Sequence, residues 1–234
     1  FNAANATETL TFNASNNAGD DTLLLDNVRI FRNGPSIANN GFEAPGFTNN
    51  QFKYQFQMTA AEVTAATWTM AGGSGISHNI SAFQGNSGDR APEGEQLAFF
   101  QGAGSSFSQM ITGFDMGADY ELSLMAMARA LGGGNDLEVL LDAGLATEIV
   151  LLDIGEVTNV SFEEMVSGAF TADRQSYMLT VRTSLNGGQL SGDRTTFVDN
   201  IWFNQLTEVI PEPATATLAM LGLGGLLMRR RREA

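Results

Sequence analysis

Short runs of alternating apolar and polar residues, separated by glycine- and asparagine-rich breaks, constrain this chain most. Alternation with period two is typical of β-strands, because successive side chains point to opposite faces of a sheet. Such runs lie at 52–56, 96–100, 107–111, 120–128, 137–141 and 177–181, with breaks at 72–75, 85–88, 102–106 and 132–134. No long segment before residue 209 has helical periodicity. The sequence therefore predicts an all-β fold, an antiparallel β-sandwich and most simply a jelly roll.

Composition excludes several classes of function. The chain has no cysteine, which removes disulfides, thiolate catalysis and cysteine-ligated metal sites. With 234 residues and 43% hydrophobic content, one domain of about 170 residues can bury a sufficient core without cross-links. The net charge of −14 disfavours nucleic acid and anionic lipid as partners, since both require a basic face. It suits an extracellular protein or one that takes up divalent cations.

The C-terminal segment has three parts that fit a membrane address. It consists of Pro211, Glu212 and Pro213, an uncharged apolar run at 214–228, and the arginines Arg229, Arg230, Arg231 and Arg232. A helix over the apolar run is about 22 Å long, short for a hydrocarbon core of about 30 Å. Arginines after a span are retained in the cytoplasm, so the preceding domain is expected to face outward. Removing residues 229–234, with four Arg and one Glu, changes the net charge from −14 to −17.

This segment, residues 209–234, resembles the PEP-CTERM sorting signal of Gram-negative bacteria. The resemblance implies recognition by exosortase, a membrane cysteine protease that acts near the Pro-Glu-Pro, after transient anchoring in the inner membrane. It also implies a mature protein at the cell surface or outside the cell. The alternatives are a plain tail anchor and a buried apolar helix. Gly222, Gly224 and Gly225 weaken a globular helix, and four arginines cannot enter a core, so we favour the sorting signal.

The N-terminal residues 1–33 resemble the end of the main domain. Apolar residues lead into Asp26-Asn27 and an alternating strand, as they do into Asp199-Asn200. We expect residues 1–33 to be the closing strands of an upstream β-sandwich copy, with residues 37–206 forming the complete domain. The alternative is that they are extra strands of the single domain. Because Phe1 follows no initiator Met or signal peptide, we expect the N-terminus to have been processed or to belong to a longer protein.

The order of several motifs in 37–206 resembles carbohydrate-binding modules of the CBM4/9 and CBM22 type. The motifs lie at 39–43, 68–69, 94–99, 117–123 and 198–201. The resemblance implies a galactose-binding-like jelly roll. It also implies an opening strand at 39–43 that Phe42 anchors, and a structural calcium ion held by Glu43 of that strand and Asp199 of the closing strand, a pairing that would connect the two ends of the domain. The alternative is that Asp199 and Asn200 form an edge turn and bond local backbone groups.

Sugar recognition requires flat aromatic faces together with amide and guanidinium groups that bind hydroxyls. Phe100, Gln101 and Arg129 are the first candidates, and Trp202 is a further one because it alternates with apolar residues on a predicted strand. The alternative for most aromatic residues is a place in the core, and the resemblance implies that place for Trp68 and Phe99. Only three Tyr and two Trp occur, fewer than we expect for a tight polysaccharide binder.

Catalysis is not expected from this sequence. His78 is the single histidine and lies among loop-forming residues, where a solvated side chain is the usual outcome. No nucleophile-turn motif is present, and the adjacent carboxylates Glu163 and Glu164 would point to opposite faces of a strand. Three functions remain: a glycan-binding module, a structural or adhesive component of an exopolysaccharide matrix, and the accessory module of an enzyme encoded upstream.

Overall fold

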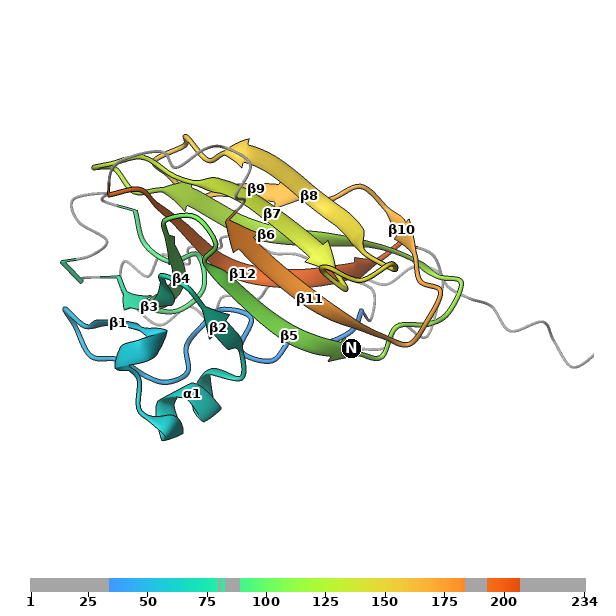
Figure 1. The fold of residues 1–234 in the computed structure, drawn as a ribbon, viewed down its shortest axis with the longest axis horizontal. Helices are drawn as coiled ribbons and strands as arrows, with labels where there is room; N and C mark the ends of the chain where they lie inside the picture. Colours follow the sequence, from blue (N-terminus) through green and yellow to red (C-terminus); the bar gives the residue numbers. More distant parts are fainter. Residues whose placement is uncertain (1–33, 80, 83–88, 184–192, 207–234) are drawn as a thin grey trace, which may run out of the picture. The chain divides into compact units, whose positions relative to one another are not determined.

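The computed structural model describes residues 34–79, 81–82, 89–183 and 193–206, and this part of the chain forms a β-sandwich. Its strands make two sheets in which every pairing is antiparallel (Figure 1). The prediction of an all-β sandwich is therefore confirmed. The predicted closing strands at 1–33 and the sorting segment at 209–234 lie outside the described residues. Within the described residues, no helix is long and apolar enough to cross a membrane.

The larger sheet has seven strands and carries the last strand of the domain at its centre. In spatial order it contains β1 (Phe52–Tyr54), β3 (Ser74–His78), β4 (Gln96–Gln101), β12 (Thr195–Gln205), β6 (Asp119–Ala128) and β10 (Phe170–Thr171), with β9 (Glu163–Val166) also paired to β6. Because β12 lies between β4 and β6, the pair Asp199-Asn200 is in a central strand. The alternative of an edge turn at this pair is wrong.

The smaller sheet has five strands. Its order is β2 (Thr69–Ala71), β5 (Ser106–Thr112), β11 (Ser176–Thr183), β7 (Asp136–Leu141) and β8 (Ile149–Glu156). Strand β11 follows the predicted alternation closely: Tyr177, Leu179 and Val181 are buried, while the residues between them are partly exposed.

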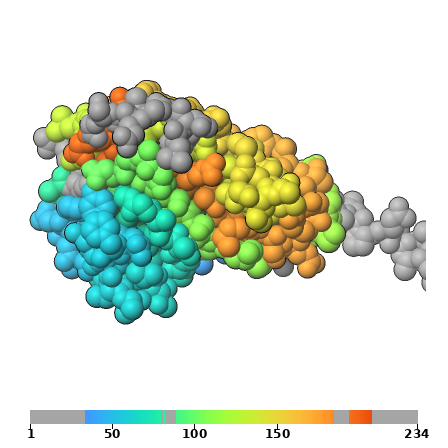
Figure 2. Space-filling model, viewed as in Figure 1, coloured from blue at the N-terminus to red at the C-terminus, as the bar shows by residue number. Residues whose placement is uncertain are grey.

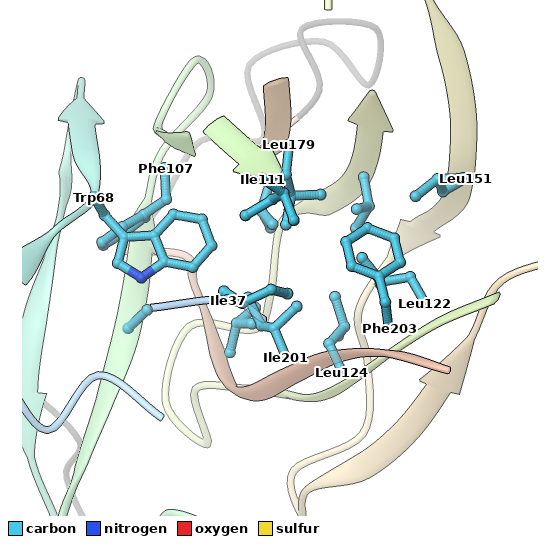
Figure 3. Packing of buried hydrophobic residues seen from close by; sticks show 14 of the residues in the cluster. Ile37, Trp68, Phe107, Ile111, Leu122, Leu124, Leu151, Leu179, Ile201 and Phe203 are labelled. Atoms are coloured by element: carbon cyan, nitrogen blue, oxygen red, sulfur yellow. The ribbon is translucent and has the colours of Figure 1, made fainter. Parts of the chain in front are cut away.

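The main core fills the space between the two sheets. Figure 3 shows Leu122, Leu124, Ile201 and Phe203 of the larger sheet facing Ile111, Leu151 and Leu179 of the smaller one. At one end of this core Phe107 meets the ring of Phe42 at 5.5 Å and that of Trp68 at 6.3 Å. Trp68 is buried as predicted, and its indole N–H donates to the carbonyl oxygen of Asn39 over 3.1 Å. The hydrogen bond satisfies the one polar atom that this side chain brings into the core.

A short helical segment precedes β2 and was not predicted. The turn η1 (Gln55–Gln57) follows β1 directly, and α1 (Ala60–Ala66) begins after Thr59. The Thr59 hydroxyl accepts from Glu62 N, and the Glu62 carboxylate accepts from Thr59 N, which forms a capping box. This local signal stabilises a helix too short to show apolar periodicity. Figure 2 shows residues 34–79, coloured blue to cyan, gathered on one side of the molecule.

A second, smaller core lies on the outer face of the seven-stranded sheet. Leu97, Phe99, Met127 and Phe197 are completely buried there, beneath Phe52, Tyr54, Ala91 and Phe162. The loop that carries Phe162 is fixed by a hydrogen bond of 2.7 Å from its backbone N–H to the Asp89 carboxylate. The middle of this outer face is therefore covered by protein.

Two expectations about local structure are wrong. His78 is not a solvated loop residue: it ends β3, is 2% exposed, and its Nε2 lies 3.5 Å from Glu95 Oε2. Residues 38–41 form a turn and 42–44 are irregular, so no opening strand lies at 39–43; Phe42 has φ +58° and is completely buried. The turn directs the Phe42 ring into the core, where it stacks on Trp68 with the centroids 5.6 Å apart.

Candidate functional site

Strand order brings Gln101 and Arg129 to the same end of the seven-stranded sheet. Gln101 is the last residue of β4 and pairs with Thr195, the first residue of β12. Arg129 directly follows β6, and its backbone N–H donates to Thr195 O over 2.9 Å. The two predicted candidates thus flank the beginning of β12, next to Asp193.

Four side chains at this end form one hydrogen-bonded row, which we call the polar row: Tyr54, Gln101, Asp193 and Arg129. The Tyr54 hydroxyl donates to Gln101 Oε1, and Gln101 Nε2 donates to Asp193 Oδ1. Arg129 Nη1 lies 2.5 Å from Asp193 Oδ2. The Asp193 side chain is 58% exposed and that of Arg129 is 16% exposed, so the row is partly open to solvent.

Electrostatics at the row are close to balanced. The Arg129 guanidinium and the Asp193 carboxylate form an ion pair, which removes most of the local excess of charge. Burial raises the pKa of the Tyr54 hydroxyl above its usual value; Asp193 adds to that shift and Arg129 opposes it. Tyr54 therefore remains a neutral hydrogen-bond donor at physiological pH.

Glycine at position 75 permits the aromatic packing behind the row. Gly75 of β3 pairs with Tyr54 on one side and with Phe99 on the other. A Cβ atom at Gly75 would lie 2.5 Å from Phe99 Cζ. Without that atom the Tyr54 and Phe99 rings meet edge to face, with centroids 5.0 Å apart at 87°. The Tyr54 ring also stacks on Phe56, with centroids 5.1 Å apart at 15°.

The other two predicted sugar-binding residues do not join the polar row. Phe100 points into the main core, is 0% exposed, and packs edge to face on Phe107 at 5.0 Å. This placement removes Phe100 from the candidate site. Trp202 is half-buried beyond the β-bulge of β12 and pairs with Ser123. Along β12, Phe197 of the small core and the bulge lie between Thr195, which accepts from Arg129 N, and Trp202.

A group of carboxylates surrounds Asp199 elsewhere on the same sheet. Asp199 is completely buried; its Oδ2 accepts from Glu93 N over 2.8 Å, and its Oδ1 has no partner among the described residues. Glu43 Oε1 accepts from the backbone N–H groups of Glu95 and Gln96 at 2.9 and 2.8 Å. Glu93 lies over Gly41, where a Cβ atom would be 2.7 Å from its carboxyl carbon.

Burial dominates the chemistry of Asp199. It raises the pKa of the Asp199 carboxyl to about 8, the carboxylates of Glu93 and Glu43 add to the shift, and backbone N–H groups of Glu93 and Asn200 oppose it. A buried carboxylate oxygen without a donor is costly, and a cation beside it would relieve that cost. The donors present are oxygens, which suit calcium. Within the described ranges, however, no three acidic or histidine side chains are close enough together to hold a metal ion by themselves.

Known proteins resemble this chain in two ways. The C-terminal residues 209–232 match the PEP-CTERM protein-sorting motif. The motif indicates an exported protein that depends on exosortase and is anchored transiently in a membrane before processing. No curated protein sequence matches the chain significantly.

Several solved structures resemble the sandwich. A Stig cyclase from Fischerella sp. TAU, 19% identical, has a TM-score of 0.50 over 73% of this chain and 96% of that chain. The module CBM61 in complex with β-1,4-galactotriose, 14% identical, has a TM-score of 0.48 over 74% and 99%. The xylan-binding CBM22-1 of Paenibacillus barcinonensis, 12% identical, has a TM-score of 0.43 over 70% and 100%. The likeness is one of fold, and the similar structures include both binding modules and enzymes.

Sequence reasoning counts Tyr54 among the aromatic residues available for sugar contact but does not favour it, and it does not single out Asp193. Tyr54 lies in an alternating run but is almost fifty residues from Gln101, and Asp193 lies in a glycine- and serine-rich stretch without a motif. Only the pairing of β12 with β4 and β6 places Asp193 between Gln101 and Arg129. No local signal in the sequence could have found this contact.

Proposed function

We propose that this exported protein binds carbohydrate through the polar row at the end of the seven-stranded sheet. The observation that supports it most directly is the unbroken series of hydrogen bonds that joins the side chains of Tyr54, Gln101, Asp193 and Arg129. Such a row offers donors and acceptors in fixed positions beside aromatic rings, which is what a sugar with many hydroxyls requires. Trp202 is left as a separate candidate contact.

The row retains hydrogen-bonding capacity for a ligand. A carboxylate accepts about four hydrogen bonds, and the described residues donate two to Asp193, from Gln101 and Arg129. The internal bonds also hold each group in place before binding, so little conformational entropy is lost when a sugar arrives. The Tyr54 hydroxyl donates to Gln101 Oε1 and so fixes the orientation of the Gln101 amide.

We further propose that calcium binds between Glu43 and Asp199, with nearby backbone carbonyl groups as additional oxygen donors. Support comes from the buried Asp199 Oδ1, which no described residue contacts by a hydrogen bond. Three segments meet at this place: residues 39–43, the segment before β4, and strand β12. The ion would neutralise the negative charge of their carboxylates. Its role would be structural, since Asp199 lies outside the polar row.

The protein's expected place of action is the cell surface or the extracellular polysaccharide layer, after exosortase removes the apolar run and the arginines. We regard the chain as non-catalytic: the polar row contains a neutralised ion pair and no nucleophile with a neighbouring base. A structural or adhesive role without a sugar site, or a role as the accessory module of an enzyme, would leave the row without a ligand.

A binding assay separates these possibilities. Purified protein comprising residues 1–208 is tested against soluble oligosaccharides of glucose, xylose, galactose and mannose, with calcium and with EDTA. We expect saturable binding to at least one of them, and loss of that binding in Gln101→Ala and Asp193→Ala. The matched control is Asp173→Asn, an exposed carboxylate paired with Arg174 at 2.8 Å near the smaller sheet. Absence of binding by the unaltered protein would remove the proposal.

A further inference from the structure

Phe56 is the most exposed of the large hydrophobic side chains among the described residues, at 71%. It lies in the turn η1, which immediately follows Tyr54. The turn is fixed by two hydrogen bonds: Tyr54 N donates to Gln57 Oε1 over 3.0 Å, and Met58 N donates to Gln55 O over 3.1 Å. The Phe56 ring is therefore held on a rigid backbone although it faces water.

The ring is also held by its neighbours. Phe56 stacks on Tyr54, and Tyr54 in turn meets the completely buried Phe99 edge to face. One face of the Phe56 ring lies on Tyr54, so the surface that contacts water is mainly the other face. The hydroxyl of the same Tyr54 donates to Gln101, which connects the exposed ring to the polar row through a single side chain.

We propose that Phe56 is the aromatic contact residue for the glycan, with its outer face against the C–H groups of a pyranose ring. This inference rests on the proposed carbohydrate binding at the polar row. The face of an aromatic ring carries negative charge density and attracts the slightly positive C–H groups of a sugar. Gln101 and Asp193 then bind hydroxyl groups of the same ligand. Tyr54 is a positioning residue: it holds Phe56 and Gln101 in fixed relation.

The arrangement explains how the chain binds sugar with few aromatic residues. Both tryptophans are at least half-buried, Trp68 in the main core and Trp202 away from the row. Tyr120 and Tyr177 are buried as well. Phe56 is thus the large aromatic surface that the described residues leave open beside the polar row. A rigid exposed ring loses little entropy on binding, which raises the affinity from a single contact.

The test separates a requirement for the ring from a requirement for apolar surface. Phe56→Leu keeps an apolar side chain and removes the ring, whereas Phe56→Trp enlarges it. Binding of cellotetraose, xylotetraose and β-1,4-galactotriose is measured by calorimetry for each variant and for Met110→Leu, an exposed residue of the smaller sheet. For the sugar that binds the unaltered protein, we expect Phe56→Leu to weaken binding about tenfold. Phe56→Trp should bind at least as tightly and change its fluorescence when that sugar is added, and Met110→Leu should bind normally.

The outcomes distinguish this inference from the function on which it depends. If Phe56→Leu binds like the unaltered protein while Asp193→Ala loses binding, the role of Phe56 is overturned and carbohydrate binding stands. If none of the three sugars nor any member of the wider panel binds the unaltered protein, both are overturned. A melting temperature unchanged by Phe56→Leu confirms that the variant is folded, as expected for an exposed side chain.

Discussion

Arg129 and Asp193 form an ion pair across the end of the seven-stranded sheet, with 2.5 Å between Arg129 Nη1 and Asp193 Oδ2. Sixty-four positions separate them in the chain. They meet because β12, which begins just after Asp193, pairs with β6, which ends just before Arg129. The insertion of the last strand at the centre of the sheet therefore assembles the polar row.

Replacing Asp193 by asparagine should reduce glycan binding much more than it reduces stability. Asn keeps one acceptor oxygen but loses the charge that orients Arg129. An ion pair with one member 58% exposed contributes at most about 1 kcal/mol to stability. We expect a melting temperature within a few degrees of the original and a dissociation constant raised roughly tenfold. Comparable losses in Asp173→Asn would indicate a general charge effect.

Truncation of two residues of β5 should change stability by very different amounts. Phe107 is completely buried against Phe42, Trp68 and Phe100, whereas Met110 is 54% exposed on the other face of the same strand. Phe107→Ala should lower the free energy of unfolding by about 3 to 5 kcal/mol, because a cavity remains. Met110→Ala should change it by about 0.5 kcal/mol or less. Urea denaturation measures both, and equal effects would contradict the assignment of faces.

Strand positions were predictable where one face is buried and the other is not. Tyr177, Leu179 and Val181 alternate with less buried residues in β11, so the period is visible in the sequence. Strand β3 was missed because every residue from Ser74 to His78 is buried, on one face by the main core and on the other by the small core. A short glycine-containing strand covered on both faces has no alternation to detect.

The orientation of side chains late in β12 depends on a bulge. Asn200 has φ +50°, and the register with β6 shifts between Asp199 and Trp202. The extra residue keeps Ile201 and Phe203 in the main core and leaves Trp202 on the outer face. Alternation alone predicts a strand here. The position of the bulge depends on packing against β4 and β6, which no local pattern specifies.

Without calcium, Asp199 should make stability fall as pH rises. Its pKa is raised to about 8 in the folded protein, above the usual 3.8, so the folded state binds more protons between these values. The free energy of unfolding changes with pH in proportion to the number of protons bound by the unfolded state minus the number bound by the folded state. This difference is negative here, so the free energy of unfolding should fall from about pH 4 to pH 8. In EDTA we expect the melting temperature to decline across this range. Asp199→Asn should flatten that decline; an unchanged slope would contradict the assignment.

Calcium should reverse this loss if Glu43 and Asp199 hold the ion. At a free concentration one hundred times the dissociation constant, a bound ion stabilises the folded state by about 2.7 kcal/mol. We expect the melting temperature at pH 8 to rise with calcium and to fall with EDTA, and the rise to be smaller in Glu43→Gln. Glu163→Gln, which changes an exposed carboxylate of β9, serves as the control. A melting temperature that changes with neither calcium nor EDTA would contradict the proposed calcium site.

Processing of the C-terminal motif should leave the sandwich intact. The motif spans 209–232, whereas β12 ends at Gln205, so removal of the apolar run takes no strand from either sheet. In a host with exosortase, we expect the exported protein to be lighter than the precursor by the mass of the apolar run and the arginines. Replacing Arg229, Arg230, Arg231 and Arg232 by alanine should leave an unprocessed precursor, because the charges that retain this end in the cytoplasm are lost. Mass spectrometry of membrane and culture fractions measures both species. Full-length precursor in the culture medium would contradict processing at this motif.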